Sequence, residues 1–244
     1  MPSRWEVRLP DINADRVTPE QLHAVVSRWL DGTVADHRRN DKKPYSVSMA
    51  HPTDGGALIE IGVARDELRD QLLACAVPGR RLEFDNQSTV LDSAPRQIDD
   101  IPWSALDSPS AATAWCIRFV TPTTFKRGNR TTPNTSLKPI LGSLRKAWGI
   151  WAPPDLAPLV LDLTLEPVWL TDVANLNSEV RYVKGNVVSG FTGRMWFACD
   201  ATAEVAAAVD RLVRLAPYSG VGAHTTHGFG VVRVEAPRRR RSVG

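Results

Sequence analysis

The sequence is poor in cysteine, in long apolar runs and in metal-binding patterns, and each shortage removes a class of protein. Its three cysteines, Cys75, Cys116 and Cys199, form no CxxC pair, which argues against a disulfide scaffold or zinc knot and favours reduced thiols in a cytoplasmic protein. No segment approaches the roughly 18 apolar residues of a membrane span, and the N-terminus lacks a secretory signal, so we expect no membrane partner and no export. The five histidines form no HExxH pattern, and we predict neither a metal site nor a cofactor.

Acidic residues are also missing from one long segment. Residues 108–154 contain seven Lys and Arg but no Asp or Glu. Residues 1–107 carry 13 basic and 18 acidic residues, a balance of −5, whereas residues 108–244 carry 17 and 9, a balance of +8. A stretch of one sign concentrates positive potential where phosphates could bind, although a solvated cationic face is the alternative that charge alone leaves open.

The first half of the chain alternates between strand and helix periodicities. Thr18, Pro19 and Gln21 supply an N-cap, a first-turn proline and a capping-box glutamine, which predict a helix up to Gly32. Around this helix we predict a strand at 5–10, a hairpin of 45–49 with 58–63, a helix at 66–76 and a strand at 81–91. The order strand–helix–strand–strand–helix–strand is the ferredoxin-like pattern.

The same order repeats after a Pro/Ser/Ala-rich linker at residues 104–112. We predict a strand at 114–120, a helix at 137–151, a strand at 159–170, a twisted pair over 180–198 broken by Gly190 and Gly193, a helix at 202–215 and a strand at 230–234. The sequence therefore predicts an α+β fold of two tandem ferredoxin-like (RRM-like) domains, 1–107 and 113–236, followed by a basic tail at 237–244.

A glycine-rich string lies between the last predicted helix and the last predicted strand. It matches neither a Rossmann fingerprint, which runs from strand to helix, nor a Walker loop, which requires Gly-Lys-Ser/Thr. Its glycines would let backbone amides approach a phosphate, while a glycine-rich hairpin turn is the plainer alternative. Two further loops of the same half are glycine-bearing or basic, and three such loops could form a surface for an extended polyanion. The three loops are residues 217–230, 183–193 and 121–133.

Histidine and lysine residues cluster around the end of the first helix. His23 and His37 could exchange protons near neutral pH, and Lys42 or Lys43 could neutralise charge developing on phosphorus. These groups suffice for RNA cleavage by its own 2′-hydroxyl, which requires no metal. The alternatives remain that His23 packs against Val26 and that His37 is merely solvated.

Several motifs resemble the CRISPR repeat-processing endoribonucleases, the Cas6 group of the RAMP superfamily. GVGAHTTHGFGVV at 220–232 is similar to the glycine-rich signature of that family. FVTPTTFKRGNRTTP at 119–133, with ILGSLRKAW at 140–148, resembles the opening of its second half, and KGNVVSGFTGRMWF at 184–197 resembles its hairpin. QLHAVVSRWL, His37 and KPYSVSMA at 43–50 are similar to the helix, catalytic histidine region and strand of the first half.

This resemblance implies a metal-independent endoribonuclease that cuts CRISPR precursor RNA once within the repeat, leaving 2′,3′-cyclic phosphate and 5′-hydroxyl ends. It implies His37, Lys43 and His23 as catalytic residues. It also implies RNA contacts by Lys42, Lys126, Arg127, Arg130, Lys184, Gly220, Gly222, His224, Thr225, His227, Gly228 and Gly230. CRISPR repeat RNA is the expected partner, and other CRISPR effector subunits or a homodimer are left open. A noncatalytic RAMP subunit that holds RNA is the main alternative, and an α+β module that binds another ligand is a more distant one.

Overall fold

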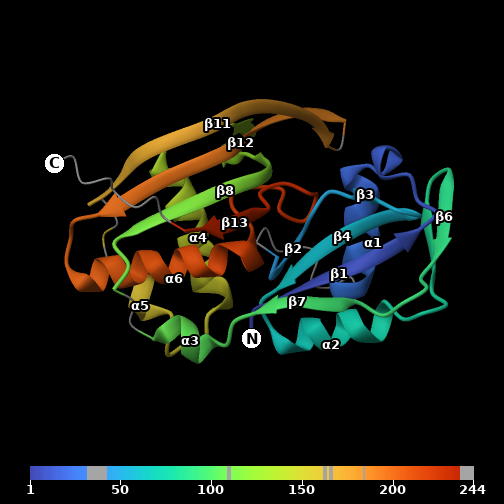
Figure 1. Ribbon diagram of the computed structural model, residues 1–244, viewed down its shortest axis with the longest axis horizontal. Helices are drawn as coiled ribbons and strands as arrows, with labels where there is room; N and C mark the ends of the chain where they lie inside the picture. The colour runs from blue at the N-terminus through green and yellow to red at the C-terminus, as the bar shows by residue number, and fades with distance from the viewer. Residues whose placement is uncertain (32–42, 109–110, 162–163, 165–166, 184, 237–244) are drawn as a thin grey trace.

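Two antiparallel sheets lie side by side in the computed structural model, which describes residues 1–31, 43–108, 111–161, 164, 167–183 and 185–236. Each sheet has helices on one face, and the long β11–β12 hairpin arches over the top of the view (Figure 1). We call residues 1–107 the N-terminal half and residues 113–236 the C-terminal half. Among the described residues, none of the helices has the length and apolar character needed to cross a membrane.

The N-terminal half follows the predicted order of elements. They are β1 (Ser3–Pro10), α1 (Pro19–Leu30), β2 (Tyr45–Val47), β4 (Gly56–Val63), α2 (Asp66–Cys75) and β7 (Arg96–Asp100), with a short helix η1 (Ala14–Arg16) after β1. The strand order is β2-β4-β1-β7, and β3 (His51–Thr53) also pairs with β4. The first arm of the predicted hairpin is therefore split into β2 and β3.

The C-terminal half repeats this plan with longer elements. They are β8 (Ala114–Thr123), α4 (Leu137–Trp151), β11 (Val168–Val183), β12 (Asn186–Cys199), α6 (Ala203–Ser219) and β13 (Val232–Glu235). The strand order β11-β12-β8-β13 is the same as in the other half when the strands are numbered within each unit. The predicted fold class, two tandem ferredoxin-like units, is confirmed.

Local sequence explains why the first helix forms where it does. Thr18 Oγ1 accepts a hydrogen bond from the Gln21 amide, and the Gln21 side chain accepts one from the Thr18 amide. This capping box satisfies two amides that the helix would otherwise leave unpaired. The apolar stripe of α1, including Leu22, Val26 and Trp29, packs into the buried core of the N-terminal half.

Four boundaries differ from the sequence prediction. Residues 81–91 form a separate hairpin, β5 (Arg81–Phe84) and β6 (Gln87–Val90), and the fourth strand of the sheet is β7 instead. The predicted strand at 159–170 begins as a short helix, α5 (Pro158–Leu161). The predicted linker at 104–112 overlaps the helix α3 (Trp103–Asp107). Gly190 and Gly193 do not break the twisted pair, because both lie within β12 and the hairpin turns before Asn186.

Backbone and side-chain contacts join the two halves at strand β2. The Val47 amide donates to the Thr225 carbonyl at 2.8 Å, and Ser48 forms a parallel bridge with Gly228. Ser46 Oγ donates to the Tyr218 carbonyl at 2.8 Å. The segment before β13 therefore extends the edge of the N-terminal sheet.

Candidate nucleic-acid interface

Two of the three loops that the sequence predicts on one surface are hydrogen-bonded to each other. The Gly230 amide donates to the Pro122 carbonyl at 3.0 Å, and the Ala223 amide donates to the Thr124 carbonyl at 2.7 Å. These bonds join the glycine-rich loop, residues 220–231, to the end of β8. The loop is thus fixed on both sides, by β8 in its own half and by β2 in the other.

The third loop approaches through the end of the β11–β12 hairpin. Val183 and Val188, which flank its turn, form a buried cluster with Phe229 of the glycine-rich loop. Strand β11 also contacts α1. The glycine-rich loop, the hairpin end and the first helix therefore meet in one region of the molecule.

Most of the glycine-rich loop serves packing. The amides of Gly220, Gly222 and Gly230 donate to Ala216 O, Ser143 Oγ and Pro122 O respectively, so these amides already have protein acceptors. A Cβ at Gly230, where φ is 71°, would lie 2.0 Å from the Val221 carbonyl oxygen. The glycines are needed for close backbone approach rather than to leave these amides open to a phosphate. Residues 222–224 are partly exposed, whereas 225–230 are buried.

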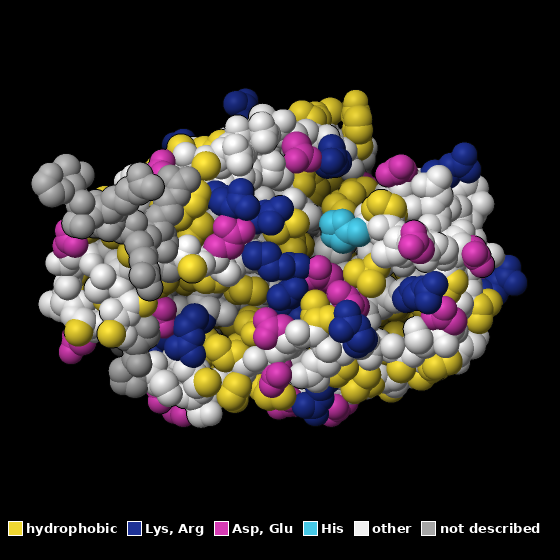
Figure 2. Space-filling view, in the orientation of Figure 1, with side chains coloured by type: hydrophobic (Ala, Val, Ile, Leu, Met, Phe, Trp, Pro, Cys, Tyr) yellow, Lys and Arg dark blue, Asp and Glu magenta, His cyan; other side chains and the backbone are white. Residues whose placement is uncertain are grey.

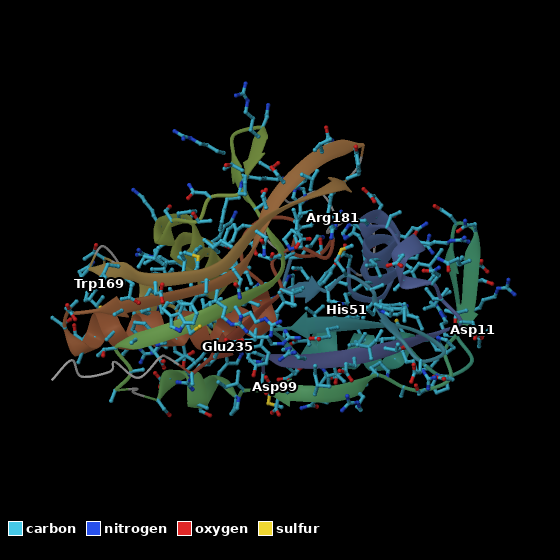
Figure 3. All side chains as sticks on the ribbon, turned by 45° about the horizontal axis from the view of Figure 1, so that its top comes forward. Asp11, His51, Asp99, Trp169, Arg181 and Glu235 are labelled. Carbon is cyan, nitrogen blue, oxygen red and sulfur yellow. The ribbon has the colours of Figure 1, made fainter. Side chains whose placement is uncertain are left out.

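The basic loop after β8 is a small hairpin, β9 (Phe125–Arg127) and β10 (Arg130–Thr132). Lys126, Arg127 and Arg130 are all exposed, and Gly128 takes a positive φ of 61° in the turn. Figure 3 shows this hairpin, in yellow-green, standing out from the molecule. Three cations on one projecting hairpin form a positively charged surface of the kind that binds the phosphate backbone of a nucleic acid.

Two histidines from different halves lie face to face. The rings of His23 on α1 and His227 in the glycine-rich loop are stacked, with centroids 4.0 Å apart and planes 18° apart. Thr226 Oγ1 lies 3.1 Å from His227 Nδ1. His224 lies edge-on to His227 at 5.8 Å and has a positive φ of 59°, which is uncommon for a residue with a side chain.

Lys43 is held at the other end of α1. Its Nζ lies 3.3 Å from a carboxylate oxygen of Asp31, the residue that caps the helix C-terminus. The Asp31 side chain is only 2% exposed. Burial, with the Asp31 carboxylate beside the hydroxyl, raises the pKa of Tyr45 far above its usual range. Asp31 and Lys43 line a cleft of about 720 Å³ that also includes Arg65, Trp103 and other residues of both halves.

The structure thus divides the residues predicted to be catalytic. His23 lies beside the loop histidines, whereas Lys43 lies beside Asp31. Asp31 is about 12 Å farther along the axis of α1 than His23. His37 lies outside the described residues, as do Lys42 and Lys184.

A row of charged side chains crosses both sheets. Cross-strand registers place Arg118 beside both Arg194 and Arg233, and Arg233 reaches across to Glu60 of β4 at 2.5 Å. Glu60 also pairs with Arg4 at 2.7 Å. Burial alone would raise the pKa of Glu60, but the hydrogen bonds and charges of Arg4 and Arg233 hold it below its usual range. Basic and acidic side chains alternate across the middle of the molecule in Figure 2.

Two residues of this region were missed by sequence reasoning. Asp31 could have been found from the sequence, because a carboxylate is unfavourable beside the negative C-terminal end of a helix dipole and therefore implies a neighbouring cation. Thr226 carried none, since its contact with His227 depends on the conformation of the loop. Trp148 and Trp151, which follow the basic residues of α4, are core residues with exposed fractions of 0% and 3%. No group of three or more His, Cys, Asp or Glu side chains that could hold a metal ion occurs within the described part of the chain.

Comparisons with known proteins place this arrangement in a family context. The family model described as "CRISPR-associated endoribonuclease Cas6" matches residues 117–232. No curated protein sequence matches. The solved Cas6 (TTHA0078) product complex is similar, with a TM-score of 0.78 and 20% identity over 96% of this chain and 99% of that one. The Cas6 (TTHA0078) H37A mutant has a TM-score of 0.72 and 22% identity over 96% and 99%. Thermus thermophilus Cas6 (TTHB231) has a TM-score of 0.70 and 22% identity over 96% and 98%. These likenesses show the fold, and the family model matches most of the C-terminal half.

Proposed function

Because a Cas6 family model matches residues 117–232 and solved Cas6 structures share the fold, we propose that this chain is a CRISPR-associated endoribonuclease that cuts CRISPR precursor RNA once within each repeat, by a mechanism that requires no metal. The 2′-hydroxyl of the nucleotide before the cut attacks the adjacent phosphorus, and the bond to the following 5′-oxygen breaks. The products are a 2′,3′-cyclic phosphate and a 5′-hydroxyl. The free thiols of Cys75, Cys116 and Cys199 are in keeping with a cytoplasmic enzyme.

The observation that carries this proposal is the meeting of a basic hairpin, the glycine-rich loop and ionisable side chains of α1 in one region. Lys126, Arg127 and Arg130 bind the RNA backbone, and the partly exposed residues 222–224 contact it nearer the cut. The backbone contacts fix the register of the strand, so that one phosphate is presented for cleavage.

The proton transfers are assigned to histidine and the charge stabilisation to lysine. His37 removes the 2′-hydroxyl proton or protonates the leaving 5′-oxygen, and His23 supplies the complementary transfer. The Lys43 ammonium stabilises the negative charge that builds on the phosphate oxygens. Because Asp31 lies about 12 Å of helix rise beyond His23, Lys43 leaves its 3.3 Å ion pair with Asp31 to reach the phosphate beside His23.

Cleavage of end-labelled repeat RNA in EDTA tests the proposal. We expect one cut by the wild-type protein and a loss of about a hundredfold in rate for His37→Ala. A 2′-deoxy substitution at the nucleotide before the cut should abolish cleavage while leaving binding intact, because it removes the attacking group.

His51→Ala is the matched control, since His51 on β3 is the histidine to which no part in cleavage or RNA contact is assigned. It should cleave at the wild-type rate. Tight binding without cleavage by the wild-type protein would contradict the proposal and favour a subunit that only holds RNA. A fully active His37→Ala would move the proton transfers to other residues.

A further inference from the structure

The stacked rings of His23 and His227 connect α1 of the N-terminal half to the glycine-rich loop of the C-terminal half. The role inferred for this contact rests on the proposed function, in which His23 takes part in cleavage. His23 belongs to α1 of the N-terminal half, and His227 reaches it from the glycine-rich loop of the C-terminal half. Their faces are 18° from parallel at a centroid distance of 4.0 Å. This geometry restricts rotation of the His23 ring about its side-chain bonds.

The His227 ring is itself enclosed. It is 6% exposed, its Nε2 atom is buried, and its Nδ1 atom lies 3.1 Å from Thr226 Oγ1. Both ring nitrogens therefore face the protein interior, which leaves neither of them to contact RNA. The enclosed His227 ring is therefore badly placed to bind RNA or transfer a proton, but it is well placed to hold the His23 ring in position.

The His23 ring differs from it in one respect. The side chain is partly exposed, and its Nδ1 atom is buried. Because Nδ1 is buried, we assign proton exchange with a substrate to Nε2. A ring that must present one nitrogen in a fixed direction benefits from a rigid neighbour on its face.

We propose that Thr226 and His227 are positioning residues, which hold the His23 imidazole so that Nε2 points toward the RNA. Thr226 fixes the rotation of the His227 ring, and the His227 face fixes the His23 ring. The loop that carries both is anchored to β2 by the Val47–Thr225 hydrogen bond. The cleavage geometry at α1 is therefore completed by the other half of the chain.

Single-turnover cleavage at saturating enzyme, together with the affinity for a 2′-deoxy repeat RNA, tests this role. We expect His23→Ala and His227→Ala each to slow cleavage about tenfold, with the dissociation constant unchanged within about twofold, because misplacement of a catalytic group affects the reaction step. His227→Phe keeps a flat ring on the His23 face but has no ionisable group, so it should cleave within about threefold of wild type. Thr226→Val should be intermediate.

Opposite results would overturn the proposal. If His227→Phe is as slow as His227→Ala, the ionisable nitrogens matter rather than the ring face. If the loss appears in the dissociation constant, His227 supports binding. A wild-type rate for His23→Ala would remove the group to be positioned, while a strong effect of His37→Ala would leave the proposed function standing. Thermal unfolding shows whether His227→Ala folds, and if it does not, His227→Phe and Thr226→Val decide.

Discussion

The two halves of the chain share one strand order but use the same connection differently. In the N-terminal half, the segment from the second helix to the fourth strand, residues 76–95, forms the β5–β6 hairpin and packs on its own half. In the C-terminal half, the corresponding residues 220–231 cross to the edge of the other sheet. The same strand order thus supports a connection that packs on its own half in the N-terminal unit, and a connection that joins the two halves in the C-terminal unit.

The two parts of the chain also differ in net charge. Residues 1–107, with a balance of −5, contain His23 and Lys43, whereas residues 108–244, with a balance of +8, contain the exposed β9–β10 hairpin. We infer a division in which the C-terminal half binds the RNA and the N-terminal half presents the reacting side chains to it. Such a division works only while the joint holds the halves together.

The largest expected effect comes from distorting the glycine-rich loop that forms that joint. Gly230→Ala should lower the free energy of unfolding by about 3 kcal/mol or more and abolish cleavage, because its Cβ would meet a backbone oxygen at a positive φ. Gly79→Ala is the matched control in the corresponding connection of the other half. Gly79 also has a positive φ, 85°, but nothing lies within 4 Å of its Cβ, so we expect a cost of only about 1 kcal/mol. Urea unfolding measures both, and equal costs would contradict the contrast.

Removing the cations of the β9–β10 hairpin should have the next largest effect. We expect the triple variant Lys126→Ala, Arg127→Ala, Arg130→Ala to bind repeat RNA about thirtyfold more weakly, which is about 2 kcal/mol. The slope of log affinity against log salt should also become shallower by about two. The double variant Arg80→Ala, Arg81→Ala on the exposed β5–β6 side is the control, and an equal loss there would show that the charge effect is nonspecific.

A smaller effect is expected at the ion pairs between the halves. Glu60→Gln should lower the free energy of unfolding by about 1.5 kcal/mol at pH 7, because the variant leaves Arg4 and Arg233 without their shared carboxylate. The pKa of Glu60 is lowered in the folded protein. Its contribution is therefore full above the unfolded pKa, near 4.5, and is lost as pH falls through the lower folded pKa.

Urea unfolding at several pH values measures this contribution. The difference between wild type and Glu60→Gln should shrink as the pH falls below about 4. Arg69→Ala is a control, because Arg69 forms its ion pairs with Asp66 and Asp70 within α2 and does not link the halves. A difference that is constant across the pH range would show that Glu60 does not act through its charge.

Local signals account for the parts of the fold that the sequence predicted well. The capping box at Thr18 and the apolar stripe behind it defined α1, and the predicted helix at 137–151 coincides with α4. The failures also have local causes. Residues 81–91 looked like one strand, but Asp85 takes a positive φ of 45° and turns the chain. Strand β7 is a mostly exposed edge strand, so it lacks the alternation that marks a half-buried strand.

The candidate site was predictable in its loops but not in its contacts. The three loops were recognisable because each is rich in glycine or in basic residues, and this composition can be read without knowing the fold. The pairing of His23 with His227 joins positions far apart in sequence, and no periodicity encodes it. The same holds for Asp31, which is recognisable as a partner of Lys43 only once α1 and β2 are placed.

The joint at β2 also has a consequence for the order of folding. Ser46 and Val47 find their partners at Tyr218 and Thr225, and Tyr218 is synthesised 172 residues after Ser46. Until then the edge of the N-terminal sheet is uncovered, and an uncovered edge can pair with other chains. The edge of the nascent first half therefore stays uncovered until translation has delivered the glycine-rich loop, and slowing translation between β2 and that loop should increase aggregation.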